Sequence, residues 1–462
     1  MLNFRGISRV GKLMWELFSW GLFEMTIRFT TILCVILMLP GFALAQSNQR
    51  ALIGGTLVDG SGGKPLKNSV VLIDGERITA VGDINSIRIP DGYEKISTEG
   101  MTVLPGLWDL HVHLLYAGHT DFPYWHRTYT GQYEKTIMPA TAQQLLMAGV
   151  TSTRDLGAPP DAIFAVKRRI AQGEIPGATI YAAGPQLTHQ PPDWAAKYRW
   201  SISGTADAKA KVNQLAEMGV DQIKVTDAET MMPDELKAIA DAAHARGLKV
   251  AAHGRTLAEI RLGLAAGFDE FEHIGLQEAE YPADLIAAIR QRNNSQKVYW
   301  APTVGFPLSA EYLAGNPESL DDPANFAGLP PAIIEDVKRA LAKWEPGLPP
   351  ATRQIIQRKV AQLQQAGVEL VIGTDGGLAA HPVSQALFRE LEAWVEDLSV
   401  APSEAIRRST SFAANLMGAG KDYGMVAEGK FADIIVVKGD PLRHIDTLRN
   451  PAIILKHGKR YR

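Results

Sequence analysis

Eight short apolar runs alternate with helical stretches between Leu107 and Asp375, and this alternation constrains the fold more than any other feature of the sequence. Apolar runs joined by helical crossovers predict parallel strands with helices packed on them. Two of the helical stretches end at Gly247 and Gly267, as helices often do. Eight such units predict an α/β fold, a (β/α)8 TIM barrel whose active-site groups lie at the carboxyl ends of the strands. The runs are Leu107–His113, Thr151–Asp155, Thr179–Ala183, Gln222–Thr226, Lys249–His253, Glu270–Ile274, Val298–Thr303 and Glu369–Asp375.

Both ends of the chain have a different character. Near the start, SVVLIDGERITAVGD is a β-rich stretch broken by Asp-Gly, and KFADIIVVKGDPL near the other end is similar. We therefore expect sheet at both ends. Between Pro302 and Pro350 the prolines are dense enough to break regular helix. This segment predicts an extended insertion before the eighth strand, either arching over the barrel mouth or lying elsewhere on the surface.

The N-terminal segment has the pattern of a secretory signal peptide. Arg28 precedes an apolar run that ends Ala43-Leu44-Ala45, which predicts cleavage after Ala45 and export to the periplasm or the medium. Leu33 precedes the single Cys34, where a lipoprotein signal needs a small residue, so lipidation is not expected. The alternative is a membrane anchor, although the run is short for a span of about 20 residues. The start codon, Met1 or Met25, stays open.

Composition excludes several classes. The net charge of −3 argues against a nucleic-acid-binding surface, and one cysteine can form neither an internal disulfide nor a Cys-rich zinc site. Removal of the predicted signal peptide, residues 1–45, would leave no cysteine and no membrane segment. A homo-oligomer is compatible with the sequence, which does not define the oligomeric state.

Polar residues able to bind metal lie at the carboxyl ends of five of the eight runs. His111 and His113 end the first run, and because residues i and i+2 of a strand point to the same side, both imidazoles can bind one ion. A polar group at a buried strand end is costly without a partner, and six in barrel order are hard to explain as isolated core residues. The other four are Lys224, His253, His273 and Asp375.

The order His-x-His, Lys, His, His, Asp resembles the metal-dependent amidohydrolase superfamily in its binuclear subtype, and within it the prolidase-like and ochratoxinase-like dipeptidases and amidases. The flanks LIGGTLVDGSG and GMVAEGKFADIIVVKGDPL are similar to the two halves of that superfamily's small β-sandwich. One departure is Ala414-Asn415-Leu416, where Asn-Pro-Ala is more usual. The resemblance implies a β-sandwich built from residues 46–104 and 425–462, around a metal-dependent barrel at 105–424.

The resemblance also implies the ligands of two divalent metal ions. His111, His113 and Asp375 would bind the more buried ion, and His253 and His273 the second. Zinc is the default, although manganese, cobalt and iron accept the same ligand types.

Lys224 would carry a CO2-derived carbamate that bridges both ions. A desolvated lysine near cations has a lowered pKa, and its neutral amine can take up carbon dioxide.

The implied reaction is hydrolysis of an amide or peptide bond in a small molecule, such as a dipeptide or an N-acyl amino acid, by a hydroxide that bridges the metals. Asp375 would take the proton and pass it to the leaving amine. A lactonase or phosphotriesterase on the same site is an alternative. A mononuclear deaminase is a weaker one, because Thr256 occupies the position of the expected glutamate, and a non-catalytic binding protein is weaker still. His189, Trp194 and Arg255 are candidate substrate contacts.

Overall fold

The computed structural model describes residues 49–345 and 348–462 of the chain. Every one of the eight predicted runs contains a strand, and these strands pair in parallel. One sheet has three strands, β7 (Leu107–Val112), β8 (Val150–Asp155) and β9 (Thr179–Ala182). The other has seven, in the order β11 (Arg199–Ser201), β10 (Gln186–Thr188), β12 (Ile223–Val225), β13 (Val250–His253), β14 (Glu270–Glu272), β15 (Tyr299–Ala301) and β16 (Glu369–Leu370).

Backbone hydrogen bonds connect the two parallel sheets in two places. The Leu110 N–H donates to the Ile372 carbonyl oxygen over 3.1 Å, and the Asp221 N–H donates to Ala182 over 2.8 Å. A single parallel bridge joins Val112 to Gly376. The predicted α/β fold with parallel strands is therefore confirmed. Strands β10 and β11, of three residues each, were not predicted.

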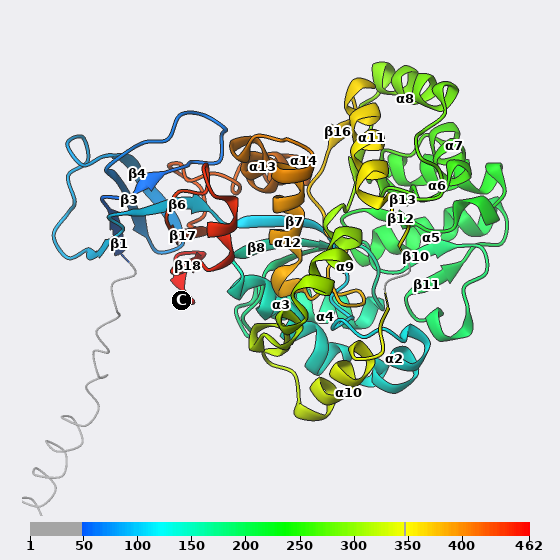
Figure 1. Ribbon diagram of the computed structural model, residues 1–462, viewed down its shortest axis with the longest axis horizontal. Helices are drawn as coiled ribbons and strands as arrows, with labels where there is room; N and C mark the ends of the chain where they lie inside the picture. The colour runs from blue at the N-terminus through cyan, green and yellow to red at the C-terminus, as the bar shows by residue number, and fades with distance from the viewer. Residues whose placement is uncertain (1–48, 346–347) are drawn as a thin grey trace, which may run out of the picture. The chain divides into compact units, whose positions relative to one another are not determined.

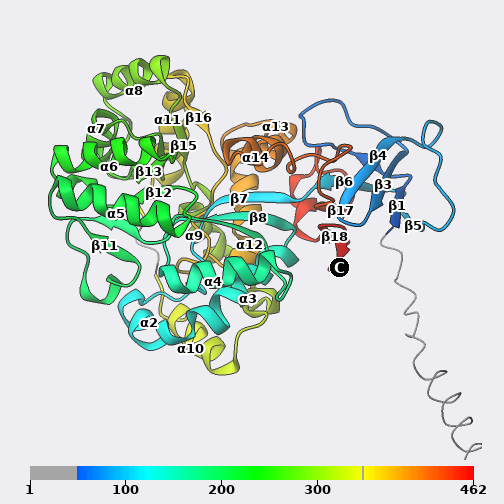
Figure 2. The same cartoon turned by 180° about the vertical axis from the view of Figure 1, so that it is seen from behind.

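Glycine marks the C-terminal ends of two predicted helices. Helix α6 ends just before Gly247 and α7 at Gly267, two predicted ends that are confirmed, and both glycines have positive φ. Helices α5, α6 and α7 lie side by side outside strands β12 and β13 (Figures 1 and 2). The α-helices are α2 (Phe122–Tyr129), α3 (Met138–Met147), α4 (Pro160–Ala171), α5 (Thr205–Met218), α6 (Pro233–Ala245), α7 (Leu257–Ala266), α8 (Ala283–Ser295), α9 (Gly305–Gly315), α10 (Pro331–Leu341), α11 (Thr352–Gln365), α12 (Val383–Glu392), α13 (Pro402–Arg407) and α14 (Ala413–Leu416).

Short 3-10 or π-helical segments occur elsewhere in the chain. Two of them, η2 and η3, follow the first and third strands of the parallel series and carry residues of the candidate site. The turns are η1 (Thr130–Gln132), η2 (Tyr133–Ile137), η3 (Asp193–Ala195), η4 (Ala228–Thr230), η5 (Pro317–Asp321), η6 (Pro323–Phe326), η7 (Ala393–Asp397), η8 (Arg408–Phe412) and η9 (Ile445–Arg449).

Both chain ends form sheet, as predicted. Strand β6 from the start of the chain pairs antiparallel with β17 from its end, so the two ends share one sheet (Figure 2). Side chains of the two end sheets form one apolar cluster, in which Val71 and Ile73 meet Val436 and Leu455. The four-stranded sheet has the order β4 (Arg77–Asp83), β3 (Ser69–Asp74), β1 (Gln49–Ile53), β5 (Glu94–Ser97), and the five-stranded one β19 (Lys459–Arg460), β18 (Ile453–Lys456), β17 (Ile434–Lys438), β6 (Met101–Pro105), β2 (Thr56–Leu57).

The proline-rich stretch from residue 302 to residue 350 is more helical than the sequence predicts. It contains α9 and α10, so the expectation that its prolines exclude regular helix is wrong. Pro331 begins α10, a position at which the missing N–H costs nothing. In this stretch a proline can therefore begin a helix as well as interrupt one.

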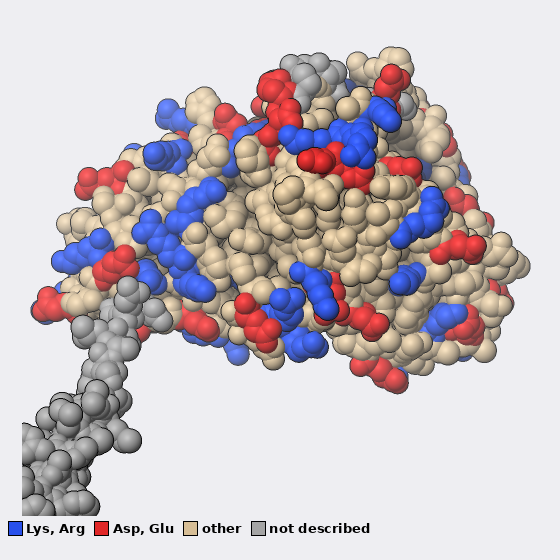
Figure 3. All heavy atoms as spheres, turned by 90° about the horizontal axis from the view of Figure 1, so that it is seen from below, with Lys and Arg blue, Asp and Glu red and all other residues tan. Residues whose placement is uncertain are grey.

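Among the described residues no helix is long and apolar enough to cross a membrane. The predicted signal peptide and Cys34 fall in residues 1–48, outside the described part of the chain. Figure 3 shows one face on which acidic and basic side chains are interspersed around a central area without charge.

Candidate metal centre

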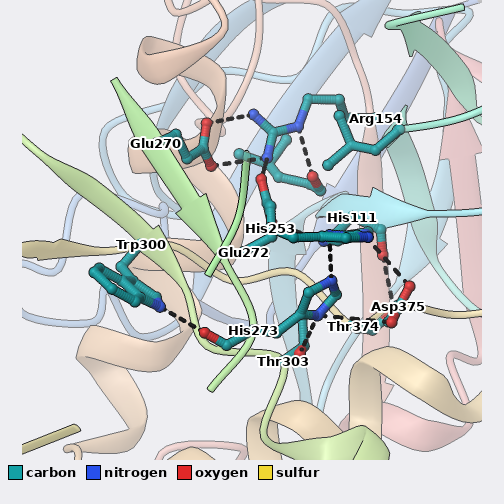
Figure 4. Close-up of polar contacts among 12 residues, drawn as sticks. His111, Arg154, His253, Glu270, Glu272, His273, Trp300, Thr303, Thr374 and Asp375 are labelled. Carbon is teal, nitrogen blue, oxygen red and sulfur yellow. Dashed lines mark hydrogen bonds and ion pairs between the residues drawn. The ribbon is translucent and has the colours of Figure 1, made fainter. Parts of the chain in front are cut away.

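A buried cluster of His111, His113 and Asp375 lies where β7 and the segment after β16 meet. One ligand atom from each residue lies within 4.8 Å of the other two. Asp375 Oδ1 is 3.3 Å from His111 Nε2 and 3.2 Å from His113 Nε2. The structure thus brings together three of the six predicted ligands around one point, and Figure 4 shows two of them, His111 and Asp375.

His253 and His273 form a second group next to this cluster. His253 Nδ1 and His273 Nε2 are 3.1 Å apart, and His273 Nδ1 lies 3.7 Å from Asp375 Oδ2. The ring centres of His111 and His273 are 4.9 Å apart. Five of the predicted ligands therefore share one buried volume.

Local backbone conformation positions two of these side chains. His273 has φ 75° and Asp375 has φ 63°, a left-handed conformation that is costly for residues other than glycine. Such strained positions concentrate at functional sites, where surrounding contacts hold them. The carbonyl of His273 accepts a 2.7 Å hydrogen bond from Trp300 Nε1, which helps to fix the turn at the end of β14.

Lys224, the sixth predicted ligand, is completely buried in the middle of β12. Its Nζ atom has no hydrogen-bond partner among the described residues. Burial lowers the pKa of Lys224 to about 8, although the nearby carboxylates of Glu272 and Asp375 oppose this shift. A buried amine without a partner is unfavourable unless another group completes its surroundings.

The protonation states suit metal binding. Burial lowers the pKa of His111, His253 and His273 well below the usual range, so these rings are neutral. Burial alone would raise the pKa of Asp375, but the adjacent His111 and His273 rings and a hydrogen bond with His113 lower it well below its ordinary value. Neutral imidazoles beside an ionised carboxylate are the forms that bind a divalent cation.

Buried charged side chains contact His111 at Nδ1, the ring nitrogen that does not face Asp375. Glu272 Oε2 lies 2.7 Å from His111 Nδ1, and Arg154 donates to Glu272 over 3.1 Å. Arg154 also donates two hydrogen bonds to Glu270, over 2.7 and 2.8 Å. Because Glu272 accepts at Nδ1, His111 Nε2 keeps its lone pair toward Asp375 (Figure 4).

Sequence reasoning missed Arg154, Glu270 and Glu272. A signal was present, since Glu270 and Glu272 alternate along a buried strand and must face the same side. Asp109 was missed as well; it accepts hydrogen bonds from the Thr374 hydroxyl over 2.7 Å and from the His111 N–H over 3.1 Å. Burial raises the pKa of Asp109 to about 7, although the hydrogen bond from Thr374 opposes this shift.

A cavity of about 450 Å³ opens beside these ligands, and His113, His253, His273 and Asp375 form part of its wall. Trp194 and Arg255, two predicted substrate contacts, also line it, whereas His189 is not among the lining residues. Other parts of the wall are aromatic or come from the proline-rich stretch; they include Tyr116, Phe122, Tyr198, Phe306, Pro307 and Leu348.

Thr256, at the position where a deaminase would carry a glutamate, has a structural role. Its hydroxyl accepts a hydrogen bond from the Glu259 N–H over 3.1 Å, and the Glu259 carboxylate accepts one from the Thr256 N–H over 3.0 Å. This reciprocal pair caps α7.

The fold and the buried cluster define a class, the parallel α/β proteins with a metal-binding group at the carboxyl ends of their strands. The model of the amidohydrolase family matches residues 102–459, and the chain belongs to that family. Family membership implies the use of divalent metal and, together with the enzyme relatives, supports a hydrolase that acts on carbon–nitrogen bonds.

Three similar proteins illustrate this membership. Ochratoxinase from Aspergillus niger is 25% identical over 452 residues, covering 87% of this chain and 84% of the relative. Imidazolonepropionase from Hyphomonas neptunium is 22% identical over 390 residues, covering 80% and 88%. The solved structure of a Xaa-Pro dipeptidase with bound methionine superposes with a TM-score of 0.66 at 23% identity, covering 89% of this chain and 99% of that one.

The donor set fits the divalent metal that the family implies. Among the described residues, His111 Nε2, Asp375 Oδ1 and Lys224 Nζ are buried and lack hydrogen-bond partners. Buried polar atoms are rarely left unpaired, so the free His111 nitrogen and Asp375 oxygen are donors that suit a divalent cation.

Proposed function

We propose that the chain is a binuclear amidohydrolase that cleaves the amide bond of a dipeptide, an N-acyl amino acid or a related amide. The observation that carries this proposal is a buried group of ligand residues with unpaired polar atoms, of which His113, His253, His273 and Asp375 line one cavity. His111, His113 and Asp375 would hold one ion, and His253 and His273 the other. Bound there, two divalent ions, zinc by default, would supply Lewis-acid polarisation of the amide carbonyl and would lower the pKa of a water molecule.

Lys224 would supply the ligand shared by both ions. With a pKa of about 8, lowered chiefly by burial, a substantial fraction of its amine is neutral near pH 8. The neutral Nζ attacks carbon dioxide, a nitrogen–carbon bond forms and one proton is released, leaving a carbamate with two oxygens. The reaction converts the neutral amine into an anion, which two neighbouring cations would stabilise.

Asp375 would move the proton during hydrolysis. It is ionised, and its Oδ1 atom faces the two histidines of the first ligand group. It accepts a proton from the attacking water and delivers it to the leaving nitrogen as the carbon–nitrogen bond breaks. The same carboxylate thus serves as general base and then as general acid.

The cavity favours a substrate with an apolar or aromatic part and an anionic end. Aromatic rings form much of one wall, and Trp194 belongs to it. Arg199 and Arg255 line the same cavity and share one carboxylate, Asp227, at 3.3 and 3.4 Å. The shared carboxylate leaves one positive charge without compensation, and a guanidinium suits a carboxylate ligand. A dipeptide or an acyl amino acid has both features.

A hydrolysis screen combined with metal analysis tests the proposal. We expect release of the amino acid from N-benzoyl amino acids or dipeptides, and about two ions per chain, the number a binuclear centre requires. Removal of the metal with a chelator should abolish turnover and lower the melting temperature, since metal binds only the folded state. Turnover confined to lactones or phosphotriesters, or full activity with one ion, would contradict the proposal.

The architecture and the export of the chain extend this proposal. We infer that the parallel strands close into an eight-stranded barrel within residues 105–424, supported by the two connecting hydrogen bonds, and that residues 46–104 and 425–462 form a β-sandwich domain. A crystal structure with an open ladder would contradict closure.

Residues 1–45 would be a signal peptide, so the protein recovered from its host should begin at Gln46. An intact Met1 or Met25 on a membrane-bound product would contradict export.

A further inference from the structure

A chain of hydrogen bonds runs through the aromatic wall of the cavity. The Tyr133 hydroxyl lies 2.8 Å from His126 Nδ1, and the Tyr116 hydroxyl lies 2.8 Å from His126 Nε2. The hydroxyls of Tyr116 and Tyr198 are 3.1 Å apart. Tyr116 and Tyr198 line the cavity, whereas His126 and Tyr133 lie behind them, so the chain leads from the core to the cavity.

Contacts between aromatic rings fix the side chains of this hydrogen-bond chain. His126 stacks on Tyr198 with ring centres 4.5 Å apart and planes inclined by 10°, and Trp194 lies 5.2 Å from the same imidazole. Phe122 packs 4.9 Å from Tyr116. These contacts join α2 to the loop that follows β10, two segments that sequence reasoning did not connect.

The neutral ring of His126 allows two donor orders along this chain of hydrogen bonds. Burial, with a contribution from Arg199, lowers the pKa of His126 to about 3, so its ring is neutral and has one donor and one acceptor nitrogen. If Tyr133 donates to Nδ1, then Nε2–H donates to Tyr116, Tyr116 donates to Tyr198, and the Tyr198 proton remains for a ligand. In the opposite direction, Tyr116 accepts the Tyr198 proton and the cavity receives no donor.

Tyr198, the end of the hydrogen-bond chain that faces the cavity, lies beside the positively charged Arg199. Arg199, the residue after Tyr198, places its guanidinium 5.7 Å from the centre of the Tyr198 ring. Its Nε atom is buried and has no hydrogen-bond partner in the described part of the chain. An anionic ligand group at this point would accept from the guanidinium and from Tyr198, and this extra hydrogen bond would select the first direction.

We propose that Tyr198 determines specificity by donating a hydrogen bond to a carboxylate of the substrate, and that His126 and Tyr133 are positioning residues that direct the Tyr198 proton into the cavity. This inference rests on the proposed function, because it concerns the substrate of the same site. It assigns the recognition of the anionic end to a tyrosine hydroxyl that His126 and Tyr133 orient, in addition to the guanidinium groups.

Two substrates with the same scissile bond test the inference. N-benzoyl-phenylalanine has a carboxylate, and its α-carboxamide is neutral; release of benzoate is measured for both. Loss of a hydrogen bond to a charged group predicts that Tyr198→Phe raises KM for the carboxylate by roughly 10- to 100-fold. We expect KM for the carboxamide to change little and kcat to stay close to that of the wild type for both substrates.

Two further variants separate the donor order of the hydrogen bonds from a general effect of removing a tyrosine hydroxyl. Tyr133→Phe removes the far donor without touching the cavity, and the same preference for the carboxylate should fall by about 3-fold, the effect of weakening one neutral hydrogen bond in the chain. Tyr181→Phe on β9, outside the cavity lining, is the matched control and should leave both KM values unchanged.

The outcomes distinguish this inference from the proposed function. A wild-type enzyme that hydrolyses neither these two substrates nor the dipeptides of the screen overturns the proposed function and this inference with it. If the wild type hydrolyses both substrates, an equal penalty on both in Tyr198→Phe, or an unchanged KM for the carboxylate, overturns the inference alone. An unchanged preference in Tyr133→Phe overturns the positioning role of the chain.

Discussion

Two groups of buried polar atoms beside one cavity differ in their hydrogen bonding: those of the predicted metal ligands, here called the ligand wall, and those of His126 with its neighbouring tyrosines, here called the aromatic wall. On the ligand wall, His111 Nε2, Asp375 Oδ1 and Lys224 Nζ lack hydrogen-bond partners in the described chain. On the aromatic wall, His126 has a tyrosine hydroxyl on each ring nitrogen. Unpaired buried atoms are costly, so we expect a bound cation to stabilise the ligand wall, whereas both ring nitrogens of His126 are already paired. We therefore expect substitutions on the ligand wall to lower metal content, and substitutions on the aromatic wall to change stability without loss of metal.

The largest effect is expected from Lys224→Ala on the ligand wall. The two ions would lose their shared ligand, and we expect the ion at His253 and His273 to leave first. kcat/KM should fall by at least ~10³, several kcal/mol of transition-state stabilisation. Metal analysis and steady-state kinetics measure both effects.

Three further observations separate a carbamate from a structural lysine. Lys224→Glu should retain more metal than Lys224→Ala, and bicarbonate should help the wild-type apoprotein to reassemble but not Lys224→Glu. Lys456→Met is a matched control, since this lysine is buried on β18 beside Asp433, away from the ligands; it should lose stability but keep its metal. Two ions and near-normal turnover in Lys224→Ala would show that the lysine is structural.

A smaller effect on the same wall is expected from Glu272→Gln. The amide keeps the size of the side chain but removes the charge that holds the proton on His111 Nδ1. Groups that orient metal-binding histidines are worth about 10- to 100-fold in metal affinity, and a competing chelator measures this loss. Glu270→Gln is the matched control, because Glu270 bonds Arg154 and not His111. Equal losses in both variants would contradict a specific role for Glu272.

The smallest effect is expected from the aromatic wall and concerns stability against pH. The folded-state pKa of His126 is about 3, lowered by burial, while the unfolded chain has a value near ~6.5. The unfolded state therefore binds a proton first, and stability falls as the pH drops from 6.5 toward 3, by about 2 kcal/mol at pH 5 from this residue. Urea unfolding at pH 7.5 and pH 5 should show a weaker pH dependence in His126→Gln than in the wild type, with the metal content unchanged. Identical pH dependence in the two proteins would refute this assignment.

The ligand wall was predictable because strands constrain it. In His-x-His the two side chains share a face, and each of the other candidates closes or follows an apolar run, so parallel pairing brings Lys224, His253 and Asp375 to one edge. Spacing alone did not reveal Glu272, because its partner His111 is 161 residues away in the chain. The proline-rich stretch misled, because a proline at a helix start and a proline that breaks a helix look alike in sequence.

The sequence by itself determined the parallel α/β fold, the sheet at both chain ends and the candidate ligands, because these follow from periodicity and from polar residues at strand ends. Only the tertiary structure decided what surrounds them. Arg154 lies behind His111 through Glu272, and Tyr133 reaches Tyr198 through His126 and Tyr116. Such contacts join loops and strands far apart in the chain, and no local pattern encodes them, since they arise only when packing removes the side chains from water and obliges each polar atom to find a partner.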